Sequence, residues 1–92
     1  MDFGEILDQI KKRWIVSERY DLIVKVDEAP RGAATGGEAI GMCAGFLLEL
    51  KQSDPPAFHE IADLVDEFAK ECAAYGLILN GYNYKAYWRR YS

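Results

Sequence analysis

The stretch from Thr35 to Lys51 constrains the fold most, because it joins a clear helix start to a long apolar face. Thr35 stands three residues before Glu38, the spacing of a capping box: the threonine hydroxyl accepts from the N–H of Glu38, and the glutamate carboxylate accepts from the N–H of Thr35. Met42 and Phe46 lie toward the polar side of this helix. A helix of this kind needs neighbours on several sides, so we expect it at the centre of a bundle. Its apolar face consists of Ile40, Cys43, Ala44, Leu47 and Leu50.

The first residues predict an amphipathic helix. Its acidic residues come early and the Lys11-Lys12-Arg13 run comes late, which suits the helix dipole. Apolar residues recur at intervals of three and four, as on one face of a helix. These residues are Phe3, Ile6, Leu7, Ile10 and Trp14.

Residues 17–28 fit two patterns. The alternation of apolar side chains from Tyr20 to Val26 suits a strand, whereas the spacing of Tyr20, Ile23 and Asp27 suits a helix. A strand here would have one possible partner, residues 77–79, and isolated two-stranded ribbons are only marginally stable. We therefore expect a helix capped by Ser17, with a break at Pro30 and Gly32 before the central helix.

A fourth helix is predicted from the Asp54 N-cap and Pro55 to Tyr75, with Gly76 as a left-handed cap. The tail beyond it has two interpretations over residues 77–84, because Asn80-Gly81 is a hairpin signal whereas the later aromatic residues have helical spacing. We expect a turn followed by a short helix. The apolar face of the fourth helix consists of Phe58, Ile61, Ala62, Val65, Phe68, Ala69 and Cys72.

Length and pattern together predict one all-α domain over residues 1–92. Its expected architecture is a small bundle of four main helices with a short C-terminal aromatic helix or turn. No apolar run reaches membrane-spanning length, and charges interrupt the N-terminal residues where a signal peptide needs an apolar core. We therefore expect a cytoplasmic protein with no membrane partner.

The formal net charge is −4 at pH 7, and the segment from Asp54 to Cys72 is its most acidic part, with six carboxylates against Lys70. This balance argues against non-specific binding to nucleic acid or an anionic membrane, and it permits attraction to a basic partner. Four carboxylates of the fourth helix fall within a sector of roughly 80° on an ideal helix. We call this set the acidic stripe: Glu60, Asp63, Glu67 and Glu71.

The acidic stripe has a plain interpretation as the solvated side of an amphipathic helix. A functional interpretation starts from energy, because like charges three or four residues apart cost a few tenths of a kcal/mol per pair, and only Lys70 is near enough in sequence to offset them. A positively charged partner would turn that cost into binding and faster association.

No feature predicts an enzyme, a metal site or a cofactor site. His59 is the only histidine and stands one turn before Asp63, but no nucleophile accompanies the pair. One histidine with carboxylates along an exposed helix provides no closed ligand set for a metal. Cys43 and Cys72 both lie on apolar faces, where a free cysteine packs as a small core residue.

The tail interleaves aromatic and basic residues, and Tyr84, Tyr87 and Trp88 form a second candidate patch. Tyrosine, tryptophan and arginine are enriched at protein-interface hot spots. The same composition allows RNA stacking with phosphate contacts from Lys85, Arg89 and Arg90, although an acidic neighbour would repel the backbone. We rank packing on the bundle first, a protein interface second and RNA contact third.

Over about residues 3–79, the order and spacing of the elements resemble the small acidic α-helical immunity proteins with which bacteria neutralise colicin-type and contact-dependent growth-inhibition toxins. The segments that carry this likeness are Val26-Asp27-Glu28-Ala29, Gly37-Glu38-Ala39 followed by Leu47-Leu48-Glu49, and Ala74-Tyr75-Gly76-Leu77.

This resemblance implies a non-catalytic inhibitor that binds the C-terminal domain of an exported toxin, often a basic nuclease, and blocks its active site or substrate groove. On this hypothesis the acidic stripe is the electrostatic element, Met42, Phe46 or the tyrosines supply apolar anchors, and Tyr84, Tyr87 and Trp88 are a second patch. The alternative is a small RNA-binding or regulatory helical domain that uses the basic aromatic tail.

Overall fold

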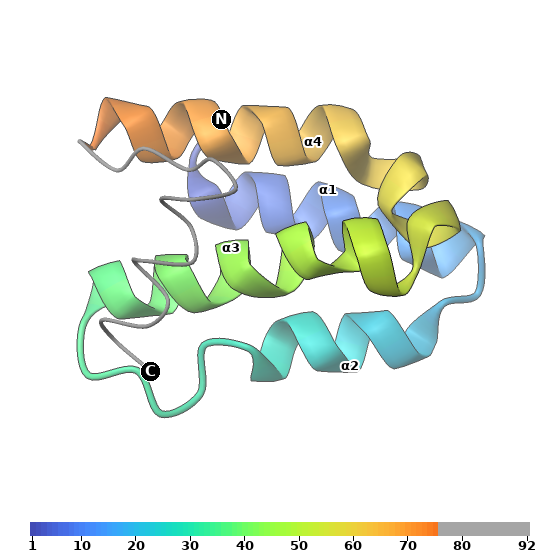
Figure 1. Cartoon of the computed structure of the whole chain (residues 1–92), viewed down its shortest axis with the longest axis horizontal. Helices are drawn as coiled ribbons and strands as arrows, with labels where there is room; N and C mark the ends of the chain where they lie inside the picture. Colours follow the sequence, from blue (N-terminus) through green and yellow to red (C-terminus); the bar gives the residue numbers. More distant parts are fainter. Residues whose placement is uncertain (76–92) are drawn as a thin grey trace.

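The computed structural model describes residues 1–75, and these form four helices with no strand among them (Figure 1). The helices are α1 (Phe3–Val16), α2 (Tyr20–Glu28), α3 (Gly36–Ser53) and α4 (Pro55–Ala74). This confirms the all-α bundle of four main helices. The expected C-terminal helix or turn, the Gly76 cap and the choice for residues 77–84 lie outside the described residues.

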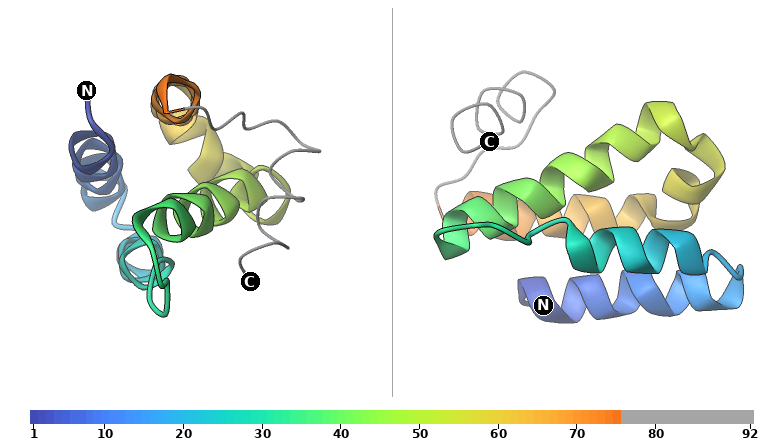
Figure 2. Two further views of the ribbon diagram at one scale, coloured as in Figure 1. Left: turned by 90° about the vertical axis from the view of Figure 1, so that its left-hand side faces the viewer. Right: turned by 90° about the horizontal axis from the view of Figure 1, so that it is seen from below.

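The four helices pack around one core. α1 and α4 lie side by side in opposite directions, α3 packs on α4, and α2 lies against both α1 and α3 (Figure 2). Trp14 is fully buried, and the centroid of its ring lies 6.4 Å from that of Phe46. Its indole N–H donates to the carbonyl of Ala57 at 3.4 Å. Trp14 of α1 therefore contacts both α3 and α4.

Side-chain caps fix the starts of three helices. The Asp2 carboxylate accepts from the N–H of Glu5 at 2.8 Å and the Thr35 hydroxyl accepts from the N–H of Glu38 at 3.1 Å. Asp54 caps α4 by accepting from the N–H of Ala57 at 3.4 Å, as the sequence predicts. The return bond of the capping box differs, because Glu38 accepts from the N–H of Ala34 rather than that of Thr35.

Residues 20–28 are helical, which confirms the preferred interpretation. Leu22 and Val26 of α2 are buried in the core, and the Lys11 ammonium of α1 binds the Asp27 carboxylate at 2.9 Å. The predicted cap was wrong: Ser17 ends α1, and α2 begins after Arg19 with no side-chain cap. The turn between them is tight because Glu18 adopts a φ of 60°.

The buried face of α4 is rotated relative to the predicted one. Ala57 and Leu64, absent from the predicted face, are buried, whereas Ala62 and Ala69 are only half-buried. The rotation follows from packing, because α4 lies between α1 and α3 and must bury a sector that meets both. The helix ends at Ala74, one residue before the predicted end. None of the described helices combines the length and apolar character that a bilayer span requires.

Candidate functional site

The acidic stripe lies along α4, which packs against both α1 and α3 (Figure 1). The stripe contacts α1 through the ion pair of Arg13 with Asp63. Glu60 and Asp63 are exposed, whereas Glu67 and Glu71 are half-buried. The structure therefore keeps the four predicted residues on one helix and accessible from one side of the bundle.

Arg13 of α1 corrects the expectation that only Lys70 offsets the stripe. Its guanidinium donates to both carboxylate oxygens of Asp63, with 2.8 Å from Nη2 to Oδ2, and Nη1 also donates to the backbone carbonyl of Glu60 at 2.9 Å. The hydrogen bonds from Arg13 hold the pKa of the Asp63 carboxyl below its ordinary value of 3.8. Asp63 is thus held in an ion pair that joins α4 to α1.

The other carboxylates of the stripe are less compensated. Lys70 lies 3.3 Å from Glu67 in an exposed i, i+3 pair. The carboxylates of Glu60 and Glu71 form no ion pair within residues 1–75. Glu71 also acts on its neighbour Cys72, because its negative charge adds to burial in raising the pKa of that thiol. Glu60 and Glu71 are therefore the two carboxylates of the stripe with no ion pair among the described residues.

The His59–Asp63 pair does not form. Asp63 binds Arg13 instead, and the exposed His59 ring contacts the ring of Phe58, with 6.5 Å between centroids. Cys43 and Cys72 are free and buried, and burial raises the pKa of each thiol from 9.0 to about 11. Within the described part of the chain, no three His, Cys, Asp or Glu side chains gather in a way that would hold a metal ion.

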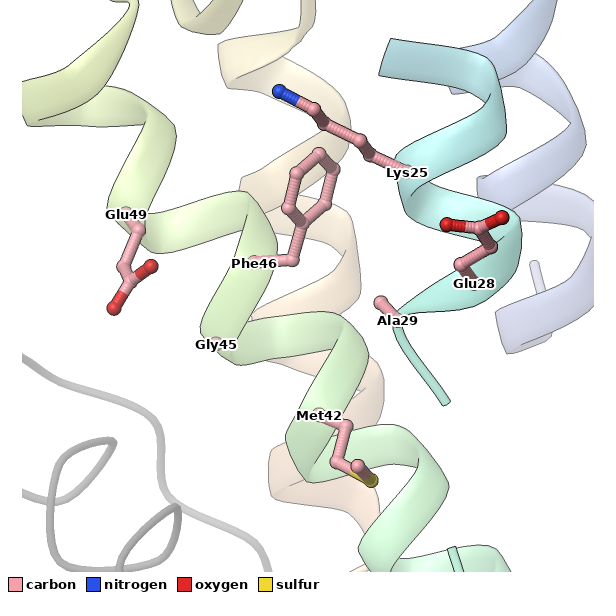
Figure 3. Close-up of a pocket in the computed structure, with 7 residues that line it drawn as sticks. All are labelled: Lys25, Glu28, Ala29, Met42, Gly45, Phe46 and Glu49. Carbon is pink, nitrogen blue, oxygen red and sulfur yellow. The ribbon is translucent and has the colours of Figure 1, made fainter. Parts of the chain in front are cut away.

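A groove between α2 and α3 was not predicted from the sequence, although Met42 and Phe46, two of the suggested apolar anchors, line it (Figure 3). Two adjoining hollows of about 300 and 290 Å³ share Lys25, Phe46 and Glu49, and together we call them the α2–α3 groove. The position of Met42 and Phe46 toward the polar side of their helix was the sequence signal for it. The apolar part of the lining consists of Leu22, Ala29, Met42, Gly45, Phe46 and Leu50.

Arg19 closes one end of the α2–α3 groove. Its guanidinium donates to Asp21 of α2, at 3.1 Å from Nη2 to Oδ2, and to Asp54, the residue that caps α4. Both contacts hold the pKa values of Asp21 and Asp54 below their ordinary value of 3.8. Arg19 thereby ties the turn between α1 and α2 to the turn between α3 and α4.

The second predicted patch, Tyr84, Tyr87 and Trp88, lies outside the described residues. Comparison of the chain with protein-family models, with curated proteins and with solved structures finds no match. The site is therefore defined by its own geometry: an acidic stripe on α4, anchored by Arg13, and an apolar-floored groove between α2 and α3.

Proposed function

We propose that the protein is a non-catalytic immunity protein that binds the C-terminal domain of an exported bacterial toxin in the cytoplasm and neutralises it. The observation that carries this proposal is the presence of Glu60 and Glu71 on the acidic stripe with no ion pair within residues 1–75. The resemblance in element order and spacing supports the same function.

Electrostatics explains how such a protein acts on a basic nuclease. A nuclease binds the phosphates of its substrate with lysine and arginine side chains. Carboxylates spaced along one helix are negative, as phosphates are, and can therefore pair with those basic side chains. Oppositely charged surfaces steer diffusional encounter, and this acceleration falls with ionic strength. Inhibition then needs no chemistry from the inhibitor, only occupation of the substrate groove.

The stripe residues have different roles in this proposal. Both carboxylate oxygens of Asp63 accept hydrogen bonds from Arg13. Asp63 therefore contributes less uncompensated charge and mainly holds α1 against α4. Glu60 and Glu71 are the principal partner-binding carboxylates, and Glu67 shares its charge with Lys70.

The first experiment is a pull-down from the source bacterium's lysate with tagged protein at low and high salt, followed by mass spectrometry. We expect recovery of a large exported protein, or its C-terminal fragment, in stoichiometric amount and weakened by salt. Recovery of RNA would instead support the rival function, in which alanine at Lys85, Arg89 and Arg90 abolishes binding and loss of stripe carboxylates improves it.

The second experiment measures association kinetics with the recovered toxin domain. Glu60→Lys and Glu71→Lys should each slow association severalfold at low salt and flatten its salt dependence. Glu18→Lys is the matched control, because Glu18 is an exposed glutamate with no ion pair among the described residues and lies in the turn between α1 and α2. Equal rates for all three variants would contradict the assignment of the stripe.

A further inference from the structure

The α2–α3 groove is separate from the acidic stripe, because its walls come from α2 and α3 and the stripe lies on α4. Each of its two hollows is near the lower limit of small-molecule pockets, which run from about 300 to 1,000 Å³. A space of this size, open along its length, suits one bulky side chain of a bound segment better than an enclosed ligand.

Phe46 and Met42 form the floor of the groove in the absence of any bound partner. The Phe46 ring rises from α3 toward α2, with Met42 one turn before it on the same helix (Figure 3). The ring of Phe46 meets Trp14 edge to face, at an interplanar angle of 79°, and Trp14 is fully buried. An apolar side chain entering the groove therefore meets a surface that needs little rearrangement, which lowers the entropic cost of binding.

The rim of the groove is acidic. Arg19 is shared by Asp21 and Asp54, which leaves one excess negative charge at that end. Glu28 and Glu49 lie on either side of Phe46 in Figure 3. Glu28 pairs with Arg31 at 3.8 Å, whereas Glu49 forms no ion pair within residues 1–75. Lys25 is the remaining cation of the rim, so carboxylates outnumber cations along the groove.

We propose that the α2–α3 groove is a second docking site, which takes one bulky apolar side chain of a basic protein partner with a lysine or arginine next to it in sequence. The apolar side chain packs on Phe46 and Met42, and the neighbouring cation pairs with Glu49. The identity of the partner rests on the proposed function, in which it is the toxin domain; the chemistry of the groove does not.

Short peptides test the groove without the toxin. The probes are acetyl-Lys-Leu-Lys-amide, acetyl-Glu-Leu-Glu-amide, which reverses the charge, and acetyl-Lys-Ala-Lys-amide, which removes the apolar anchor. The readout is the methyl NMR signal of Met42, with Met1, the other methionine of the chain and outside the groove lining, as the internal reference. We expect the Lys-Leu-Lys peptide to shift Met42 at the lowest concentration and to leave Met1 unchanged.

A pair of variants then tests the charge assignment. Glu49→Lys should weaken binding of the Lys-Leu-Lys peptide about two- to fivefold, the range for an exposed ion pair, whereas Glu18→Lys should leave it unchanged. The proposal is wrong if the three peptides shift Met42 alike, if Met1 responds as much as Met42, or if both variants bind equally. If the groove proposal fails in this way, the stripe variants should still slow association with the toxin domain. The two proposals are therefore tested independently.

Discussion

At the scale of single residues, partners distant in sequence decide which charges are available. Asp63 looks uncompensated in the sequence because its ion-pair partner is 50 residues away. The cysteines were predictable, since both occur on apolar faces and both are buried. Local spacing thus gave the stripe and the core cysteines, whereas Arg13–Asp63 depends on the packing of α1 against α4.

Arg13→Gln tests the ion pair through pH. The folded-state pKa of Asp63 is lowered below 3.8, so the stabilisation from Arg13 is present above that value and is lost as the pH falls through the folded-state pKa. Urea unfolding of the variant should therefore show lower stability than wild type at pH 7 and a smaller difference at the acid end, where only the hydrogen bond from Arg13 to the Glu60 carbonyl remains to be lost. Lys12→Gln, which removes an exposed cation with no ion pair among the described residues, should track wild type throughout.

The two cysteines should be inert in the folded protein. A pKa raised from 9.0 to about 11 lowers the thiolate fraction at pH 8 by about a hundredfold, and burial removes access as well. Reaction with dithionitrobenzoate should thus be at least about a hundredfold slower in buffer than in urea. Rapid modification of Cys43 or Cys72 in buffer would show that the core opens readily.

At the scale of elements, the caps at Thr35 and Asp54 were predicted correctly, whereas the cap at Ser17 was wrong. Thr35 and Asp54 mark the starts of α3 and α4 because a side-chain cap is a local interaction. Periodicity left α2 ambiguous, since nine residues contain too few turns to separate a period of 3.6 from a period of two. Burial of Leu22 and Val26 against other helices settles α2 as a helix, and no local signal contains that information.

Asp54 has two roles, and two substitutions separate them. Asp54→Asn keeps a side-chain oxygen that can cap α4 but removes the negative charge that binds Arg19, whereas Asp54→Ala removes both. We expect thermal unfolding to rank the proteins wild type, Asp54→Asn and Asp54→Ala in order of decreasing stability. Equal midpoints for the two variants would mean that the amide does not replace the carboxylate as a cap.

At the scale of the whole molecule, the fold was predictable because four amphipathic segments have few ways to bury their apolar faces together. The α2–α3 groove was not, because it depends on how far two helices diverge around Phe46. The side chain of Phe46 is half-buried, so its position on the helical wheel left open whether it faces solvent, the core or a groove.

Matched isoleucine substitutions test whether the helices unfold as one unit. Ile10 and Ile61 are fully buried on α1 and α4, whereas Ile15 of α1 is 51% exposed. Ile10→Ala and Ile61→Ala should each cost about 2 to 5 kcal/mol of unfolding free energy. Ile15→Ala should stay within about 0.5 kcal/mol, apart from a small gain in helix propensity.

These costs are large for a domain of this size, since stability runs at roughly 0.05 to 0.15 kcal/mol per residue. Because Ile10 and Ile61 belong to one core, either buried substitution should lower the stability of all the helices together. Far-UV circular dichroism and amide hydrogen exchange, measured along a urea series, should then report one shared loss of stability. Loss of protection confined to the helix that carries the substitution would show that α1 and α4 are held more loosely than their packing implies.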